Sequence, residues 1–465
     1  MNPLFNASIY KTRRDHLKES VHSGIAIFLG NDEAPMNYPS NTYKFRQDSN
    51  FLYFFGLSIP GNAAIIDFDE NRDIIFGNDF DIEDIIWMGN QPTLASLAEK
   101  VAVSEVMPLA KLAEYIQTAQ VKGRKIHFTP PYRGENKIWL SNLTGISLQA
   151  IQQEASVELI KGIVNLRSTK EACEIAEMET ACKIGHQMHT AVMRNCVAGT
   201  SERELAGMAE GIALAHGNGI SFPVILSQHG ETLHNHDHNG ILKTGKMLLT
   251  DAGAEGFMNY CSDYTRTLPV GGKFTQKQQE IYEIVLKANT EAIAAARPGI
   301  YNRELHTLAS EIIATGLKEI GLMKGDVKQA VKQGAHTLFF PHGLGHQLGL
   351  DVHDMEDLGE DWVGYDDTIQ RDPIFGWSSL RMARELKPGF VITVEPGIYF
   401  IPQLIQIWKT ENKFSSFINY NKVEEYLDFG GIRIEDDVLI IENGHQVLGP
   451  HLPKTVNELA NIIGN

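Results

Sequence analysis

Five side chains of types that bind metal ions lie between residues 251 and 435, each in a short strand-like or glycine-rich stretch. They are Asp251 in LLTDAGAE, Asp263 in CSDYTRTLPV, His346 in PHGLGHQLGLDVHD, Glu395 in VITVEPGIYF and Glu435 in GGIRIEDDVLII. Four carboxylates and one imidazole are too few for two separate closed metal sites. They suit one dinuclear site in which a carboxylate bridges the ions and water fills the open positions. The set predicts a metal-dependent hydrolase.

The segment around His346 also contains His342 and His353 and is rich in glycine. Glycines such as Gly343 and Gly345 let a backbone pass close to a site, which a packed helix or strand does not need. One imidazole among carboxylates suits Mn²⁺, Co²⁺ or Zn²⁺, and mostly oxygen ligands favour Mn²⁺. Histidines that do not bind metal can transfer protons or stabilise charge.

A second histidine-rich stretch, LHNHDHNG, places His234, His236 and His238 at every other position. On a strand the three imidazoles would share one face and could form a separate metal patch. In a loop they would be solvated histidines. The sequence leaves both alternatives open for His236 and His238.

The two aspartates are expected to meet on a β-hairpin. Apolar residues precede Asp251, β-type residues follow Asp263, and a glycine-bearing turn lies between them. A hairpin brings carboxylates on neighbouring strands side by side.

An internal repeat places the remaining ligands. Residues 198–212 and 298–312 match in register at an offset of 100, at Gly199/Gly299, Arg203/Arg303, Glu204/Glu304, Leu205/Leu305, Ala209/Ala309 and Ile212/Ile312. Each copy predicts a helix pair followed by strands that carry acidic ligands. A pseudo-twofold domain would set the two aspartates against the two glutamates, with the metal site in a cleft between the copies.

The first 165 residues differ from the rest in their sequence pattern, because short apolar runs alternate with helical stretches. Short β-branched runs at 24–30, 62–68 and 73–77 predict strands, and stretches near 9–21, 92–101 and 107–119 predict helices. We therefore expect a small α/β domain over 1–165 and a catalytic domain over 166–465. Ser168 with Glu171, and Ser201 with Glu204, have the spacing of capping boxes and predict two helix starts in the second domain.

Composition narrows the class of protein. The 465-residue chain has a formal net charge of −17, which disfavours nucleic acid and anionic membrane as partners. Its N-terminus lacks the apolar core of a signal peptide, and no long apolar run follows. The four cysteines form no CxxC pair or regular framework, as expected for reduced thiols in the cytoplasm.

Together, LLTDAGAE…SDYTRT, HGLGHQLGLDVHD, VEPGIYF and GIRIEDDV resemble the proline-specific metallopeptidases, comprising prolidase (Xaa-Pro dipeptidase) and aminopeptidase P. In the first half, YKFRQDSNFLYFFGLSIPG and IIWMGNQ resemble the N-terminal domain of these enzymes. The resemblance covers nearly the whole chain. It implies an α+β protein, with a small α/β domain followed by a pseudo-twofold domain of the pita-bread fold.

The resemblance also implies roles for individual residues. Asp251, Asp263, His346, Glu395 and Glu435 would bind two metal ions that activate a water, with Asp263 and Glu435 as bridges. Glu395 would also act as general base. His234 and His353 would flank the scissile bond, His342 would lie in the same cleft, and Arg433 would support a carboxylate or a proton path.

The sequence after residue 378 resembles the long connection of bacterial prolidases, and Arg381 matches an arginine that binds the substrate's terminal carboxylate. A guanidinium suits that bidentate task. We therefore expect hydrolysis of the Xaa-Pro bond in dipeptides. The alternatives are an aminopeptidase P that releases the first residue of longer peptides and, more remotely, a catalytically silent peptide-binding relative.

Trp87 in IIWMGN has two interpretations. It could be a core residue of the small domain. In prolidase-like relatives, however, the corresponding aromatic side chain reaches from one subunit to wall the active site of its partner, and an indole packs well on a proline ring. The second interpretation predicts a homodimer or a higher homo-oligomer.

Overall fold

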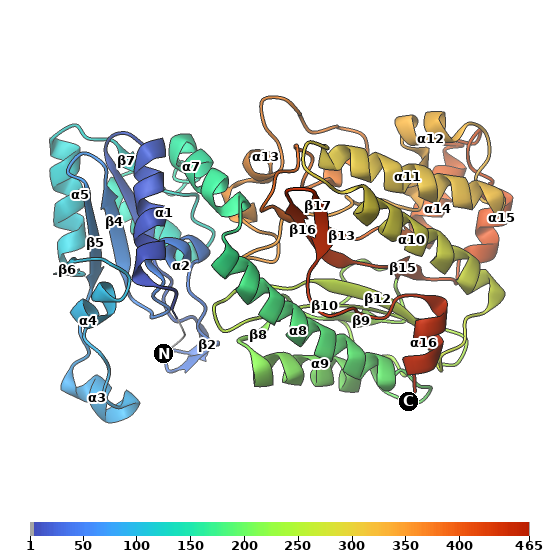
Figure 1. Cartoon of the computed structure of the whole chain (residues 1–465), viewed down its shortest axis with the longest axis horizontal. Coiled ribbons are helices and arrows are strands. Elements are labelled where there is room, and N and C mark those ends of the chain that lie inside the picture. Colours follow the sequence, from blue (N-terminus) through green and yellow to red (C-terminus); the bar gives the residue numbers. More distant parts are fainter. Residues whose placement is uncertain (1–3, 465) are drawn as a thin grey trace. The chain divides into compact units, whose positions relative to one another are not determined.

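The computed structural model describes residues 4–464 and divides into two compact units. Of these residues, unit 1 comprises 4–167 and 355–362, and unit 2 comprises 168–354 and 363–464. Figure 1 follows the chain from unit 1, in blue, to unit 2, in green to red. Within the described residues, no helix is both long and apolar enough to span a membrane.

Unit 1 is built on a five-stranded sheet of order β6-β5-β4-β1-β7. The strands are β1 (Ile25–Leu29), β4 (Ala63–Asp67), β5 (Arg72–Gly77), β6 (Glu105–Pro108) and β7 (Ile126–His127). β1, β4 and β5 pair antiparallel, whereas β7 and β6 join the two edges in parallel. The short hairpin of β2 (Pro35–Tyr38) and β3 (Asn41–Thr42) is separate from this sheet.

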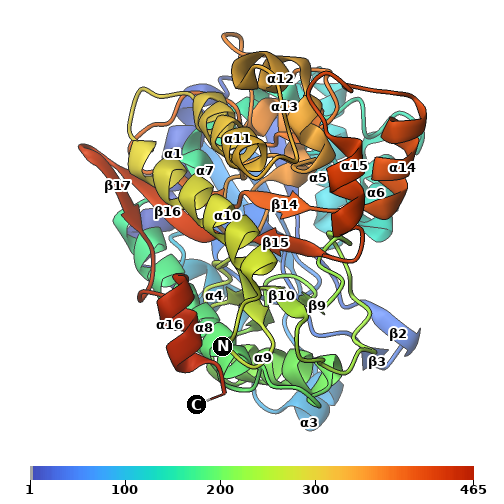
Figure 2. The ribbon, with the colours of Figure 1, turned by 90° about the vertical axis from the view of Figure 1, so that its right-hand side faces the viewer.

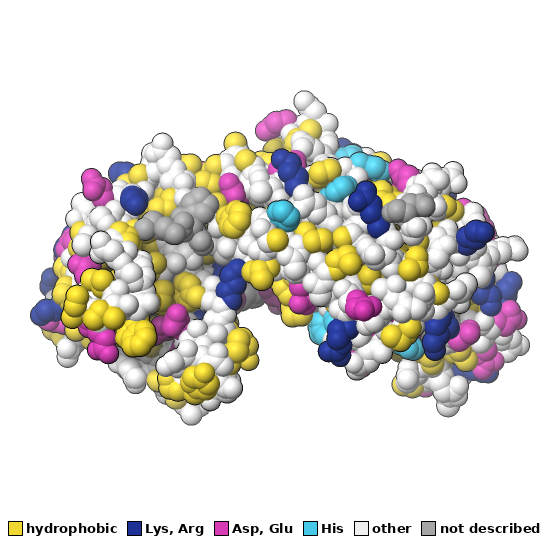
Figure 3. Space-filling model, turned by 90° about the horizontal axis from the view of Figure 1, so that it is seen from below, with side chains coloured by type: hydrophobic (Ala, Val, Ile, Leu, Met, Phe, Trp, Pro, Cys, Tyr) yellow, Lys and Arg dark blue, Asp and Glu magenta, His cyan; other side chains and the backbone are white. Residues whose placement is uncertain are grey.

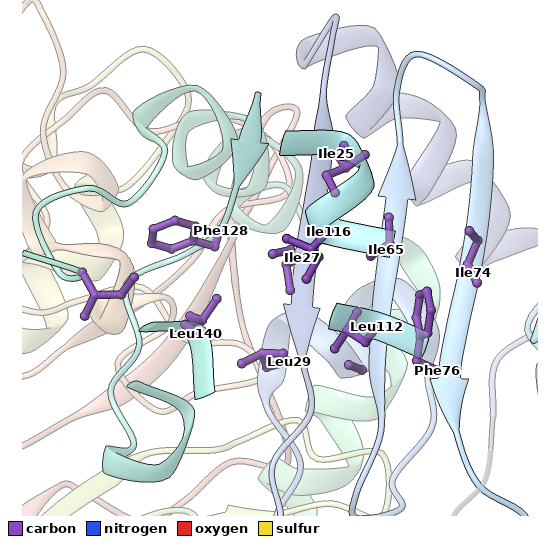
Figure 4. Close-up of a cluster of buried hydrophobic side chains, with 13 residues drawn as sticks. Ile25, Ile27, Leu29, Ile65, Ile74, Phe76, Leu112, Ile116, Phe128 and Leu140 are labelled. Atoms are coloured by element: carbon purple, nitrogen blue, oxygen red, sulfur yellow. The ribbon is translucent and has the colours of Figure 1, made fainter. Parts of the chain in front are cut away.

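Alternation along the strands gives this sheet two apolar faces, as expected for strands covered on both sides. Ile25, Ile27 and Leu29 of β1 face a core completed by Leu112 of α5 and Leu140 of α6 (Figure 4). On the opposite face, Phe28 packs against Phe54 and Phe55 of α2, with ring centroids 5.1 and 5.8 Å apart. The helices of unit 1 are α1 (Ala7–Ser20), α2 (Ser49–Phe55), α3 (Ile82–Met88), α4 (Leu94–Glu99), α5 (Lys111–Val121), α6 (Gly134–Thr144) and α7 (Val157–Ser168).

Unit 2 contains two similar halves, each with a helix pair and a three-stranded antiparallel sheet. The first half has α8 (Ala172–Arg194), α9 (Glu202–His216) and the sheet β12-β10-β9, formed by β9 (Ile225–Ser227), β10 (Met247–Ala252) and β12 (Tyr264–Pro269). The second half has α10 (Gln276–Ala295), α11 (Asn302–Glu319) and the sheet β13-β16-β17, formed by β13 (Val391–Val394), β16 (Asp436–Ile441) and β17 (Gly444–Val447). In Figure 2, α10 and α11 lie side by side, and α10 contacts β13 of the second half.

The repeated sequence forms the same element in both halves, in agreement with the predicted pseudo-twofold domain. Ser201 and Glu204 close the N-terminus of α9 as a capping box, and at the N-terminus of α11 the Glu304 carboxylate accepts a hydrogen bond from Tyr301 N at 3.1 Å. Ser201 and Tyr301 also each form an isolated antiparallel bridge to a distant segment.

Smaller elements complete unit 2. They are β8 (Gly219–Ile220) paired with β11 (Ala254–Glu255), β14 (Gly397–Tyr399) paired with β15 (Gly431–Arg433), and the helices α12 (Val327–Gln333), α14 (Pro402–Thr410), α15 (Tyr420–Val423) and α16 (Val456–Ile462). Short 3-10 turns of unit 2 cover Ala335–Leu338, Trp377–Ser379 and Glu424–Tyr426. The turn Glu356–Leu358 belongs to unit 1, and the first three residues of α13 (Glu360–Val363) belong to unit 1 and its last residue to unit 2.

One of the two predicted helix starts is wrong. Ser168 ends α7 instead of capping α8, and its hydroxyl accepts a hydrogen bond from Arg384 Nη2 at 2.6 Å. Glu171 is the residue that caps α8, in a capping box with Glu174. The spacing of Ser168 and Glu171 is that of a capping box, but the Ser168 hydroxyl binds Arg384, which is distant in the sequence, instead of the N-terminus of α8.

Candidate metal centre

The two aspartates of the site are carried by the hairpin of β10 and β12. Asp251 lies in β10 opposite Thr265, and Asp263 directly precedes β12. Residues 263 and 265 point to the same face because side chains alternate along a strand. The connection is longer than a tight turn, since β11 lies within it and pairs with β8. Both carboxylates are buried, with exposed fractions of 8% for Asp251 and 4% for Asp263.

The two glutamates come from the sheet of the other half. Glu395 directly follows β13 and Glu435 directly precedes β16, which pairs with β13. Thr265 of the hairpin forms a backbone bridge with Glu435, so this residue joins the strands of both halves. The cluster is therefore assembled where the two repeats meet, as the duplicated sequence predicted.

His346 reaches the carboxylates from the glycine-rich loop. Gly345 is required there, because a Cβ at this position would lie 2.0 Å from the carbonyl oxygen of Thr393 in β13. His346 Nδ1 lies 2.9 Å from the carbonyl oxygen of Gln347, an atom that can only accept, so Nδ1 carries the proton. Its Nε2 then keeps a lone pair and lies 3.5 Å from both Asp263 Oδ2 and Glu395 Oε1.

These groups fit a metal ion. Ligand atoms of Asp263, His346 and Glu435 all lie within 4.8 Å of one another, and all three residues are buried. Asp251 Oδ1 and Asp263 Oδ1 are buried without a hydrogen-bond partner among the described residues. Buried lone pairs of this kind are costly unless a cation or a proton occupies them. Three of the five predicted ligands therefore form a group that can hold a metal ion.

The electrostatics of the cluster lead to the same conclusion. Burial raises the pKa of Asp263, and the neighbouring Asp251 raises it further. Burial likewise raises the pKa of Glu435, with a contribution from Asp263. Like charges packed in a dry site disfavour ionisation of every member, and a divalent cation would reverse that balance.

A hydrogen-bond chain connects the carboxylates to His342. Arg433 Nη2 donates to Asp251 Oδ2 at 2.5 Å, and Nη1 donates to Tyr399 Oη at 2.8 Å. His342 Nδ1 lies 2.8 Å from the carbonyl oxygen of Gly343, which makes Nδ1 the donor and Nε2 an acceptor from Tyr399 Oη at 2.8 Å. Burial lowers the pKa of His342 to about 3, in keeping with a neutral ring.

The cluster lines a cavity of about 570 Å³ in unit 2. His234, His342, His353, Arg381 and Arg433 line the same cavity. Its apolar part comes from Phe222, Pro223, Ile225, Leu233, Val352 and Phe375. The five predicted metal ligands, the three predicted catalytic histidines and the two predicted substrate-binding arginines therefore line one space, of the size of a small-molecule site.

The structure also distinguishes between alternatives that the sequence left open. His236 and His238 lie in a loop, where the Nδ1 of His236 lies 3.4 Å from Val224 O and that of His238 lies 3.0 Å from Leu226 O. His236 also lines the cavity. Trp87 is not a core residue of unit 1, since it lies on α3 with 80% of its surface exposed.

Tyr399 and Thr265 were not singled out from the sequence. Thr265 Oγ1 donates to Glu435 Oε2 at 2.6 Å and accepts from Arg433 Nε at 3.1 Å. The two-residue period of strands could have identified Thr265, which follows Asp263 by two positions. Tyr399 could have been found from the same period only if the pairing of β14 with β15 were known.

Comparison with known proteins agrees with this geometry. Residues 176–442 match the model of metallopeptidase family M24, and residues 10–127 match that of the aminopeptidase P N-terminal domain. The human Xaa-Pro dipeptidase is 31% identical over 95% of this chain and 89% of its own length. A probable Xaa-Pro aminopeptidase of Sordaria macrospora is also 31% identical, over 97% and 94%.

Solved structures give the same picture. Zn-substituted aminopeptidase P of Escherichia coli, in complex with product, superimposes with a TM-score of 0.81 at 28% identity and 99% coverage of both chains. The same enzyme with the inhibitor Pro-Leu matches with a TM-score of 0.80.

Proposed function

Because this chain belongs to metallopeptidase family M24, we propose that it hydrolyses the Xaa-Pro peptide bond, most readily in dipeptides. One observation carries the proposal: ligand atoms of Asp263, His346 and Glu435 lie within 4.8 Å of one another in the lining of a 570 Å³ cavity. The similarity to an Xaa-Pro dipeptidase and to Xaa-Pro aminopeptidases supports the bond that is cleaved.

Two divalent ions would be held by Asp251, Asp263, His346, Glu395 and Glu435. Four of these five ligands are carboxylates, which favours Mn²⁺ over Co²⁺ or Zn²⁺. When bound, the ions would lower the pKa of a shared water and polarise the scissile carbonyl.

The chain's own groups would bind the substrate and move protons. Glu395 is the proposed general base, because its carboxylate is anchored by Thr393 Oγ1 at 3.3 Å and faces His346 at 3.5 Å. His234 and His353 are proposed to donate hydrogen bonds to the scissile carbonyl or to the substrate's carboxylate. The ring of His342 would be held in place by its hydrogen bond from Tyr399 Oη, and Tyr399 is held in turn by a hydrogen bond from Arg433.

A proline ring fits the apolar side of the cavity. A peptide bond to proline has no N–H, so recognition by backbone pairing fails and a shaped pocket is needed. Leu233 and Val352 each adjoin a proposed catalytic histidine in the sequence and line the cavity with Ile225. These side chains are proposed to form the proline pocket.

Arg381 supports a preference for dipeptides. It lines the same cavity as the metal ligands, and a guanidinium there can clamp the carboxylate that directly follows proline in a dipeptide. In longer peptides that carboxylate lies farther along the chain. The alternative, release of the first residue from longer peptides, is favoured by the similarity to aminopeptidases P.

Trp87 is proposed to act in a second copy of the chain. It lies on α3 with Ile82, Ile86 and Met88, and all four are more than half exposed. In Figure 3 apolar side chains gather over α3, in yellow. We propose that the chain forms a homodimer or a higher homo-oligomer in which this tryptophan walls the partner's cavity.

The cytoplasm is the proposed location, since all four cysteines are described and none forms a disulfide.

The deciding experiment compares Ala-Pro with Ala-Pro-Ala as substrates, with and without added Mn²⁺. The proposal expects Mn²⁺-dependent hydrolysis with a higher kcat/KM for the dipeptide. Preference for the tripeptide would establish the aminopeptidase alternative. Absence of hydrolysis of both, in protein shown to contain metal, would refute Xaa-Pro peptidase activity.

A further inference from the structure

The loop between His346 and His353 is closed into a compact turn. Asp354 N donates to the carbonyl oxygen of Gln347 at 3.0 Å, and Gly349 N donates to that of Asp351 at 3.1 Å. The turn brings the imidazoles at its two ends together, with ring centroids 4.2 Å apart. The spacing between a proposed metal ligand and a proposed catalytic histidine therefore depends on how this turn is held.

The carboxylate of Asp354 holds the turn from inside. Its Oδ1 accepts a hydrogen bond from Asp351 N at 3.3 Å. The carboxylate lies where a side chain at position 349 would be, because a Cβ on Gly349 would come within 2.4 Å of Asp354 Oδ2. The turn and the carboxylate thus require each other.

Lys170 pairs with this carboxylate in the buried interior of unit 2. Its Nζ lies 2.8 Å from Asp354 Oδ2, and both side chains are 1% exposed. An ion pair so deeply buried contributes little net stability, because the desolvation of both charges offsets their attraction. What it does provide is one defined position for each charged group.

The backbone of Lys170 is tied to the sheet that bears the glutamates. Lys170 N donates to the carbonyl oxygen of Gly389 at 2.8 Å, and Gly389 N donates to that of Ile440 in β16 at 2.8 Å. β16 begins directly after Glu435 and pairs with β13, which ends directly before Glu395. Lys170 therefore connects the turn that carries His353 to the strands that carry Glu395 and Glu435.

We propose that Lys170 is a positioning residue: through Asp354 it fixes His353 at its working distance from the metal centre. His346 has anchors outside the turn, since its backbone N–H donates to Thr393 Oγ1 at 3.1 Å and its carbonyl oxygen accepts from Thr393 N at 2.9 Å. Loss of the ion pair displaces His353 and spares the metal ligand. The catalytic part of this inference rests on the proposed Xaa-Pro hydrolysis, whereas the positional part does not.

The test is a double-mutant cycle of Lys170→Met with His353→Ala, measured on Ala-Pro with the Mn²⁺-loaded protein. Lys170→Met should lower kcat by roughly 10- to 100-fold, within the loss expected for one oxyanion donor, with a small change in KM and an unchanged metal content. In the His353→Ala background the same substitution should lower kcat less than about threefold, because residues that act through one another are not additive. An equal loss in both backgrounds overturns the proposal.

A matched control uses the ion pair of Arg14 and Asp73 in unit 1, where Arg14 Nε lies 2.8 Å from Asp73 Oδ2. Asp73→Asn should lower stability and affect kcat equally in both backgrounds. If Lys170→Met does not fold, Asp354→Asn removes the same charge pairing with a nearly isosteric side chain and takes its place in the cycle.

A measurement without substrate separates this inference from the proposed activity. In Zn²⁺-loaded protein with ¹³C-labelled histidine, the resonance of His353 is assigned by its disappearance in His353→Ala. It should shift or broaden in Lys170→Met, while that of the exposed His451 stays in place. An unchanged His353 resonance overturns the positioning role even if the protein hydrolyses no Xaa-Pro peptide, and a shifted one supports it in either case.

Discussion

Thr265 Oγ1 donates a hydrogen bond to Glu435 Oε2 at 2.6 Å, although the two residues belong to different copies of the internal repeat. Their backbones also pair, with Glu435 N donating to Thr265 O at 3.0 Å. The position of a proposed bridging carboxylate is therefore set by the other half of the domain. A carboxylate with one oxygen so oriented leaves its second oxygen available to a metal ion, as outer partners of metal ligands commonly do.

Removal of a proposed bridging carboxylate should release at least one metal ion from the site. Asp263→Ala or Glu435→Ala is expected to abolish activity and to release at least one metal ion per chain, because two cations would then face each other poorly screened. Metal analysis of protein purified without chelator, alongside the peptide assay, measures both effects. Asp428→Ala, at an exposed acidic residue, is the control. Near-normal turnover in either variant would show that the bridge assignment is wrong.

Substitution of the two histidines of the turn, His346 and His353, should have different effects on metal content and on kcat. His346→Ala should lower metal content, since its Nε2 faces the carboxylates at 3.5 Å. His353→Ala should keep the metal and lower kcat by roughly 10²–10³-fold, the scale for losing an oxyanion donor. Metal content and kcat are measured on the same preparations. Loss of metal from the His353 variant would make that residue a ligand.

Arg381 should discriminate between substrate lengths. If it binds the carboxylate of a dipeptide, Arg381→Ala should lower kcat/KM for Ala-Pro by roughly 10- to 150-fold, the cost of a lost charge-assisted hydrogen bond. Ala-Pro-Ala should be affected much less, and this substrate serves as the internal control. An equal loss on both peptides would assign Arg381 a structural role and favour the aminopeptidase alternative.

Trp87 should matter for substrate binding and not for the fold. Trp87→Ala is expected to raise KM for Xaa-Pro dipeptides without a change in metal content, because 80% of the side chain is exposed and little packing is lost. Val121→Ala, at another exposed apolar residue of unit 1, should leave KM unchanged. Size determination at micromolar concentration accompanies the assay. A fully active monomer of 51.8 kDa would exclude a role in trans.

His336 should make unit 2 sensitive to acid. Burial lowers its pKa to about 3, against about 6.5 in an unfolded chain. The folded state therefore holds a neutral ring, and its contribution to stability is complete above pH 6.5 and is lost as the pH falls toward 3. Between pH 8 and pH 5 this one group should cost on the order of 2 kcal/mol of unfolding free energy.

Replacement of His336 by leucine tests that dependence by urea unfolding at pH 8 and pH 5. Neither ring nitrogen has a hydrogen-bond partner among the described residues, so no such bond is lost. His336→Leu should lose less stability than the wild type between the two pH values. Leu338→Ala, at a buried neighbour, should destabilise equally at both. The same acid loss in His336→Leu as in the wild type would contradict the assignment.

Local sequence patterns were enough to predict many of the helices and strands. The β-branched run at 24–30 and the capping box at Ser201 depend on neighbours a few residues away, and they form β1 and the start of α9 where the sequence predicted a strand and a helix. The Ser168 cap failed for the complementary reason: Arg384, more than two hundred residues later, takes the hydroxyl that a local cap would have used. A local motif holds only where no distant partner competes for the same group.

By itself, the sequence determined the chemical types at the site, the hairpin that carries Asp251 and Asp263, the repeat that sets them opposite Glu395 and Glu435, and the family to which these motifs belong. Tertiary structure alone decided the chain from Asp251 through Arg433 and Tyr399 to His342, the exposure of Trp87, and the burial of Lys170 against Asp354. The physical reason is range. Periodicity and caps act over a few residues, whereas these contacts depend on how close packing brings together segments up to 184 residues apart.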